Sequence, residues 1–187
     1  FVYGLIRKGS RAKEYETALT WLYDYGLVYK INQINKPGLP LKAYENIASF
    51  KLFVLDIGLL SALSELNAKT LLEGNKVFEE FKGALTEQYV LQQLKTLKNL
   101  PIFYWTSNSA SSEIDFIIQH NSDIIPIEAK AALNLQAKSL KTYREKFNPN
   151  ISIRTSTADY KKDADLYDIP LYLIESLFTV ISTELPQ

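Results

Sequence analysis

Apolar residues recur every three or four positions in the segment that follows the first thirteen residues. This spacing is typical of one face of an amphipathic helix, and Gly26 is a residue type that commonly ends one. The residues at these positions are Tyr15, Ala18, Leu19, Leu22 and Tyr25. The pattern predicts a helix over residues 14–25.

The residues that follow predict two strands around a turn and then a second helix. Short apolar runs lie at 27–31 and 50–56, and residues 35–40 between them are rich in Pro and Gly. Such runs are typical of strands and such loops of turns, whereas the stretch 57–66 has helical spacing. Helix, strand, loop and strand is the order of the latter half of a winged-helix unit. We therefore predict a winged-helix-like α+β unit over residues 1–66.

A polar stretch between residues 67 and 75 marks the predicted boundary to a second unit, which spans residues 67–187. The pattern there predicts a helix over 78–97, strands over 101–105, 113–118 and 126–130, a helix over 140–147, strands over 151–156 and 171–174, and a final helix from Glu175. This order indicates an α/β fold in which helices cover a mixed sheet.

The amino-acid composition indicates which binding partners and which cellular compartment are expected for the protein. Hydrophobic residues make up 47% of the 187 residues, enough for a packed core. Lys plus Arg and Asp plus Glu both number 21, so any contact with nucleic acid must come from local patches. The lack of cysteine excludes disulfides and thiolate metal sites, and we expect a cytoplasmic protein. No apolar run approaches the roughly 20 residues that span a bilayer, so no membrane partner is expected.

Three charged residues interrupt the apolar strands predicted within residues 113–130. Side chains alternate across a strand, so Glu128 and Lys130 share one face. A hairpin through residues 121–123 would set Asp115 beside Glu128. Two neighbouring carboxylates in a partly buried place repel each other, and Lys130 supplies only one positive charge. The pattern favours a divalent ion such as Mg²⁺, which prefers oxygen ligands.

The predicted helix over 78–97 contributes a further carboxylate. Glu87 precedes Val90, Leu91 and Leu94 by three, four and seven residues, so it lies on the apolar face of that helix. A third carboxylate is thus expected to point inward.

Five segments carry a resemblance to a known family, and in chain order they read FKGALTEQYV, EIDFII, PIEAK, AKSLKTY and IPLYLI. The chain resembles the domain of unknown function found at the C-terminus of many prokaryotic AAA-type ATPases. The resemblance extends over nearly the whole chain and includes the upstream segments WLYDYGLVYKI and FKLFVLDIGLL.

That domain is similar to the restriction-endonuclease-like, or PD-(D/E)xK, superfamily. Its pattern is an acidic residue on the first helix, an Asp on one strand and (D/E)xK on the next, which Glu87, Asp115, Glu128 and Lys130 match. Ile114 stands where the superfamily has Pro. The resemblance implies a restriction-endonuclease-like mixed sheet flanked by helices over residues 67–187, behind the winged-helix-like unit.

The resemblance further implies a DNA nuclease that depends on Mg²⁺ or Mn²⁺. Asp115 and Glu128 would hold the metal, which polarises a phosphodiester and acidifies bound water, and Glu87 would be an outer or second-metal ligand. Lys130 would position the water or steady the developing charge. The ATPase domain would lie upstream in the same chain, because no P-loop motif occurs here and the sequence, which begins with Phe and lacks Met, reads as part of a longer protein.

Other interpretations stay open. Asp115, Glu128 and Lys130 would also fit a purely structural cross-strand ion cluster, and the whole chain would fit a non-catalytic DNA- or protein-binding module that regulates the ATPase. The chain has two basic stretches, each of which either contacts phosphates or is a solvated surface. The first consists of Arg7, Lys8, Arg11 and Lys13, and the second of Lys138, Lys141, Arg144 and Lys146. His120 is expected to be a solvated loop residue without a role.

Overall fold

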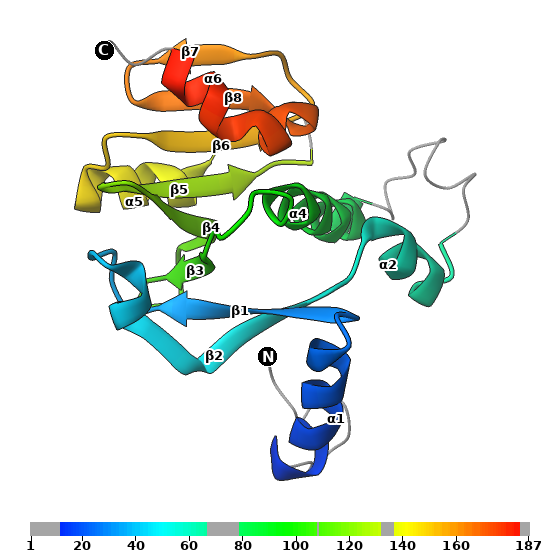
Figure 1. The fold of residues 1–187 in the computed structure, drawn as a ribbon. Helices are drawn as coiled ribbons and strands as arrows, with labels where there is room; N and C mark the ends of the chain where they lie inside the picture. The colour runs from blue at the N-terminus through cyan, green and yellow to red at the C-terminus, as the bar shows by residue number, and fades with distance from the viewer. Residues whose placement is uncertain (1–11, 67–78, 108, 132–136, 184–187) are drawn as a thin grey trace.

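One eight-stranded mixed sheet organises the chain (Figure 1). The computed structural model describes residues 12–66, 79–107, 109–131 and 137–183. The strands are β1 (Val28–Ile34), β2 (Glu45–Val54), β3 (Ile102–Thr106), β4 (Glu113–His120), β5 (Asp123–Ala129), β6 (Ser152–Ser156), β7 (Lys161–Asp163) and β8 (Leu166–Pro170). Their order across the sheet is β2-β1-β3-β4-β5-β6-β8-β7. The predicted α/β class is confirmed.

The helices of the described residues lie before, between and after these strands. They are α1 (Ala12–Asp24), α2 (Ile57–Leu63), α4 (Glu79–Leu94), α5 (Lys138–Phe147) and α6 (Leu177–Thr183), with 3-10 turns η2 (Leu41–Tyr44) and η4 (Leu171–Ser176). The side chain of Asp56 caps α2, because its Oδ1 accepts a hydrogen bond of 2.7 Å from the Leu59 N–H. All but one of the segments predicted as helix or strand thus have that type in the structure.

The pairing within the sheet is partly parallel and partly antiparallel. β3, β4 and β5 form an antiparallel meander, while β6 pairs parallel with both β5 and β8. β1 is antiparallel to β2 and parallel to β3. The β1–β2 hairpin of the predicted winged-helix-like unit is therefore continuous with the sheet of the second unit. The predicted boundary at 66/67 borders residues 67–78, which lie outside the described residues, and the division stays a prediction.

Two apolar clusters form the core, one with α4 and one with α5. Val90, Leu91 and Leu94 of α4 pack with Phe116 and Ile127 of the sheet. Leu140 and Tyr143 of α5 belong to the second cluster, which also contains Trp105, Ile114 and Ile117. These side chains are at most 2% exposed, so both helices are anchored by apolar burial, the dominant favourable term in folding. The sheet is thereby held between helices, as predicted.

The prediction of a strand over residues 171–174 is wrong. Those residues form η4, and the strand lies just before them as β8. Pro170 ends β8 because proline has no N–H to donate to a strand ladder. The run LYLI is apolar because Ile174 is buried and Leu171 and Leu173 pack against the α4 cluster. A short apolar run of this kind looks the same in a buried strand and in a buried helical turn, so the sequence does not distinguish them.

Helix α1 forms as predicted, but its side chains stay largely exposed. Figure 1 shows α1 below the start of β1, away from α4 and α5. Trp21 is 61% exposed and Tyr25 is 72% exposed, and the two rings contact each other at 6.0 Å between centroids. The helix ends where Gly26 adopts a φ of 70°, a left-handed conformation that suits glycine. Of the apolar face that the sequence predicts, Tyr15 and Leu19 are half-buried, whereas Leu22 and Tyr25 are exposed.

Candidate functional site

The β4–β5 hairpin sets Asp115 against the end of β5. A two-residue turn joins His120 to its partner Asp123, and Asn121 in that turn has a φ of 52°. The paired register runs back to Phe116 opposite Ile127, so Asp115 and Glu128 are the next residues on the two strands. The Ala129 N–H donates a hydrogen bond of 2.8 Å to Asp115 Oδ2. The side chain of Asp115 is therefore held at the start of the segment that contains Glu128 and Lys130.

A bulge in β4 lies between Ile114 and Ile117, in the stretch that contains Asp115. Phe103 pairs with Ile117 and Trp105 pairs with Ile114, so β4 advances by one residue more than β3 between these two pairs. An extra residue of this kind bends the strand and redirects its side chains, and such bulges are common beside functional sites. The irregular backbone explains why Ile114 and Ile117 belong to the same apolar cluster, although strict alternation would place them on opposite faces.

Glu128 is almost completely buried, with 4% of its surface exposed. Lys130 Nζ donates a hydrogen bond of 2.7 Å to Glu128 Oε1, which confirms that the two side chains share a face. The other carboxylate oxygen, Oε2, is buried and has no hydrogen-bond partner in the part of the chain that the structure describes. A buried oxygen without a partner is costly, so a proton, a water molecule or a cation at this atom would stabilise the site.

The electrostatics of the site disfavour two ionised carboxylates. Burial raises the pKa of the Asp115 carboxyl well above its usual range, and repulsion from Glu128 and Glu87 adds to the effect against a weaker contribution from Lys51. Burial also raises the pKa of Glu128, although Lys130 lowers it in part. The pair therefore favours a bound proton or a bound cation.

Lys51 is a site residue that the sequence does not predict. It lies on β2, and its Nζ is 2.5 Å from Glu113 Oε1, 3.5 Å from Glu87 Oε2 and 5.3 Å from the centroid of the Tyr104 ring. Burial alone would lower the pKa of its ammonium, but Glu87 and Glu113 outweigh burial and raise it, so Lys51 remains a cation. One sequence feature could have identified Lys51: it is a charged residue between Phe50 and Leu52 in an otherwise apolar run. Asp115 is identified by the same kind of interruption.

Glu87 lies on α4 as predicted, and its side chain is 32% exposed. The neighbouring Gln88 fixes this helix to β2, because its Oε1 accepts from the Val54 N–H at 3.1 Å and its Nε2 donates to the Val54 carbonyl at 2.8 Å. Gln92 accepts a hydrogen bond of 3.2 Å from the Ile57 N–H, one turn further along α4. These contacts fix α4, which bears Glu87, against β2, which bears Lys51.

The carboxylates of the site suit a metal ion as a pair and not as a triad. Among the described residues, no three His, Asp or Glu side chains converge in a way that would hold one ion. Asp115 accepts a hydrogen bond from Ala129, the residue after Glu128, and is repelled by the Glu128 carboxylate, while Glu87 faces Lys51. Mg²⁺ is commonly bound through one or two carboxylates with water completing its shell, so the pair and the unpartnered Glu128 Oε2 fit it. The metal role of the three residues stays a prediction.

The other candidates of the sequence contribute less to this site. His120 lies at the end of β4, before the turn, as the sequence predicts, but it is half-buried and stacks on Phe178 with 4.0 Å between ring centroids, so the expected solvated loop character is wrong. Arg144 forms a bidentate pair with Asp165, in which Nη2 lies 2.6 Å from Oδ1. Arg7, Lys8 and Arg11 lie outside the described residues.

The second basic stretch borders a cavity. The cavity has a volume of about 340 Å³, and its lining residues are Ala137, Lys138, Leu140, Lys141, Arg144, Arg154 and Leu166. Because Arg144 and Arg154 are both paired with aspartates, much of the positive charge of this lining is already neutralised. The cavity is therefore a weaker candidate for phosphate binding than its four basic residues suggest.

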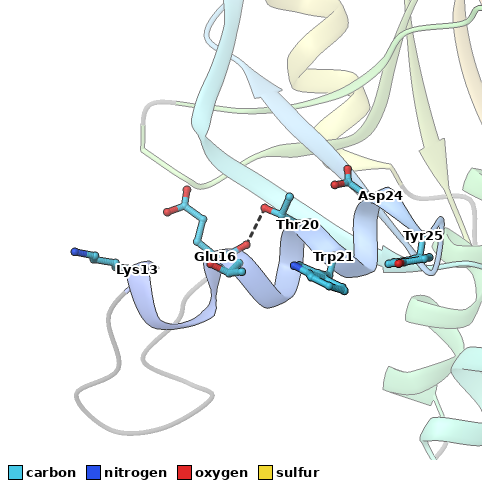
Figure 2. Close-up of a pocket in the computed structure, with 7 residues that line it drawn as sticks. Lys13, Glu16, Thr20, Trp21, Asp24 and Tyr25 are labelled. Carbon is cyan, nitrogen blue, oxygen red and sulfur yellow. Dashed lines mark hydrogen bonds between the residues drawn. The ribbon is translucent and has the colours of Figure 1, made fainter.

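A larger hollow follows one face of α1. Its volume is about 580 Å³, and its lining residues are Lys13, Glu16, Thr17, Thr20, Trp21, Asp24 and Tyr25. Figure 2 shows the rings of Trp21 and Tyr25 on one flank of the helix and Thr20 and Asp24 on the other. The Thr20 hydroxyl donates to the Glu16 carbonyl at 2.8 Å. None of the carboxylates at the β4–β5 site lines this hollow.

Comparison with known proteins gives two family matches. Residues 82–174 match a domain of unknown function (DUF4143), and residues 1–70 match a second domain of unknown function (DUF8612). No curated protein and no solved structure matches the chain. No helix among the described residues has the length and apolar character needed to cross a membrane.

The two family matches divide the residues of the candidate site. The match over residues 82–174 contains Glu87, Asp115, Glu128 and Lys130, whereas Lys51 lies in the match over residues 1–70. The predicted similarity to a domain of unknown function is thus confirmed for residues 82–174.

Proposed function

We propose that the Asp115–Glu128 pair binds Mg²⁺ or Mn²⁺ and that the protein hydrolyses phosphodiester bonds in DNA. The observation that carries the proposal is the buried, unpartnered Glu128 Oε2 beside a second carboxylate. The raised pKa values of both carboxyl groups support it, because a divalent cation relieves the repulsion that raises them. A cluster of ion pairs that only stabilises the fold would leave the buried Glu128 Oε2 without a partner.

The bound ion would supply Lewis acidity at a phosphodiester and acidify a water molecule. In the hydrolysis, water attacks phosphorus, the bond to one ester oxygen breaks, and the products are a phosphate monoester and a free hydroxyl. The hydrogen bond from Ala129 fixes the orientation of the Asp115 carboxylate. Lys130 is 27% exposed, so its ammonium lies between the buried pair and solvent, where it can offset the charge that develops on phosphate.

The order of elements supports the relationship to restriction-endonuclease-like nucleases that the resemblance implies. Helix α4, strands β3, β4 and β5, helix α5 and strand β6 follow one another as in the predicted pattern. We propose the same context for the chain, with an AAA-type ATPase upstream in the longer protein that controls access of DNA to the site.

A cleavage assay tests the proposal. Supercoiled plasmid, linear duplex and single-stranded DNA are incubated with the chain, and with the longer protein that includes the ATPase, in the presence of Mg²⁺ or Mn²⁺. We expect nicking or cleavage that EDTA abolishes and that E128Q slows by roughly 100-fold or more. E145Q is the matched control, because Glu145 is exposed on α5 and its contact to Lys141 is 3.8 Å long. Intact DNA in every reaction would contradict the proposal.

A second candidate function is a protein-binding module that regulates the ATPase without cleaving DNA. The exposed Trp21 and Tyr25 rings favour it, because large aromatic side chains dominate the binding energy of protein interfaces. The ATPase rate of the longer protein separates the two candidates. A change of rate in W21A/Y25A combined with no effect of E128Q on rate or DNA would favour the module. Cleavage lost in E128Q alone would favour the nuclease.

A further inference from the structure

Lys51 places a permanent positive charge at the carboxylates of the site. We propose that its ammonium takes the place of a second metal ion, so that the site binds a single divalent cation. This inference rests on the proposed function and goes further, because it assigns a role to a residue outside the D…ExK pattern. It also makes the β1–β2 hairpin a part of the site.

Formal charge supports one ion over two. The ionisable groups of the site are the carboxylates of Glu87, Glu113, Asp115 and Glu128 and the ammonium groups of Lys51 and Lys130. Four negative and two positive charges leave a formal charge of −2, which one divalent cation neutralises. Without substrate phosphate, a second divalent cation would make the site positive by the same amount, and a partly buried uncompensated charge is unfavourable.

The position of Lys51 explains why Glu87 does not join the metal pair. Its Nζ lies 3.5 Å from Glu87 Oε2 and 2.5 Å from Glu113 Oε1, so the ammonium bridges two carboxylates. An ion that used Glu87 as a ligand would share this carboxylate with the ammonium. The two positive centres would then repel each other across a short distance.

The surroundings of Lys51 keep its side chain in place. Its backbone is paired with Ile31 in the β1–β2 hairpin, and the side chain is 21% exposed over the ring of Tyr104. Gln88 hydrogen-bonds both backbone groups of Val54, three residues along β2, and so ties the strand to the helix that bears Glu87. The ammonium is therefore a built part of the site and not a mobile surface lysine.

Metal-binding stoichiometry tests the inference on the whole 187-residue chain. Mn²⁺ is titrated into the wild type, K51M and K51R, with calorimetry for the heat and electron paramagnetic resonance for free Mn²⁺. We expect one ion per chain for the wild type and for K51R, which keeps the positive charge. We expect K51M to bind its first ion about tenfold more tightly, the equivalent of one pKa unit of lost repulsion, and to gain a second ion.

The outcomes separate this inference from the function on which it rests. Two ions in the wild type, or the same stoichiometry and affinity in K51M as in the wild type, would overturn the role of Lys51 and leave the metal site intact. Absence of Mn²⁺ binding in the wild type would overturn the metal site and the inference together. K51Q, a second neutral variant, replaces K51M if circular dichroism shows that the latter is unfolded.

Discussion

Asp115 combines three features that oppose its ionisation, because it is buried and lies near both Glu128 and Glu87. A carboxyl group whose pKa is raised by folding stabilises the folded protein only while it is protonated. That stabilisation is complete below the pKa of the unfolded chain, about 3.9 for Asp, and disappears as the pH rises through the folded pKa. At neutral pH, without metal, the raised pKa of Asp115 therefore weakens the fold.

The stability of D115N should reveal this cost. Asn is uncharged and its oxygen can still accept the hydrogen bond from Ala129. In metal-free buffer at pH 8 we expect the melting temperature of D115N to exceed that of the wild type by about 3 °C, the shift expected for roughly 1 kcal/mol in a chain of this length. The difference should vanish near pH 4, where the wild-type carboxyl is also neutral.

Differential scanning calorimetry from pH 4 to pH 8 measures this effect. D159N is the control, because Asp159 is exposed, and its melting temperature should follow that of the wild type at every pH. A D115N variant that melts below the wild type at pH 8 in EDTA would show that the Asp115 charge stabilises the folded protein, against our expectation. Added Mn²⁺ should raise the melting temperature of the wild type and have little effect on D115N.

At the scale of elements, β6 and β8 are joined by a buried ion pair. Arg154 and Asp168 are partners in the register, and two hydrogen bonds of 2.7 and 2.8 Å link the guanidinium to the carboxylate. Asp168 is 6% exposed. Arg144 and Asp165 form a pair of the same bidentate type, but their side chains are 30% and 35% exposed. The chain thus contains the same interaction at two levels of burial.

Burial should decide what each of these pairs contributes to stability. We expect R154M to lower the free energy of unfolding by about 3 kcal/mol, because Asp168 would be left as a buried charge without its partner. R144M should cost less than about 1 kcal/mol, since water solvates Asp165 once the arginine is removed. Urea unfolding followed by circular dichroism measures both values. Equal losses in the two variants would contradict this argument.

Short-range patterns in the sequence predict the elements better than they predict the neighbours of each element. The alternation and polar turn within residues 113–130 predict the β4–β5 hairpin and the shared face of Glu128 and Lys130, since both depend on residues close in the chain. Lys51 reaches Glu113 from 62 positions away through the β1–β3 pairing, and no local pattern contains that approach. β7, with the sequence KKD, is absent from the prediction because an exposed polar strand has no apolar alternation.

At the scale of the whole molecule, the β1–β2 hairpin is an integral part of the sheet. Gln33 and Ile34 pair with Tyr104 and Trp105 of β3, and Ile34 is fully buried in the α5 cluster. Ile31 on the same strand belongs to the α4 cluster. Both clusters therefore include side chains from the segment that the sequence predicts as a separate winged-helix-like unit.

Removal of residues 1–66 should consequently disrupt the second unit. A chain of residues 67–187 would expose the edge of β3 and the apolar side chains that Ile31 and Ile34 cover, and an exposed hydrophobic edge favours aggregation. It would also lack Lys51. We expect this truncated chain to be aggregated in size-exclusion chromatography and to lack the cooperative melting of the complete chain.

Co-expression of residues 1–66 and 67–187 as separate chains provides the control for this truncation. If the loss reflects the missing strands, the two pieces should assemble through the β1–β3 edge and regain cooperative melting. Their Mn²⁺ stoichiometry should then equal that of the intact chain, because reassembly returns Lys51 to Glu87 and Glu113. A monomeric 67–187 chain that melts cooperatively at the wild-type temperature would instead establish two independent domains. The hairpin would then contribute a cation to the site without contributing to the stability of the sheet.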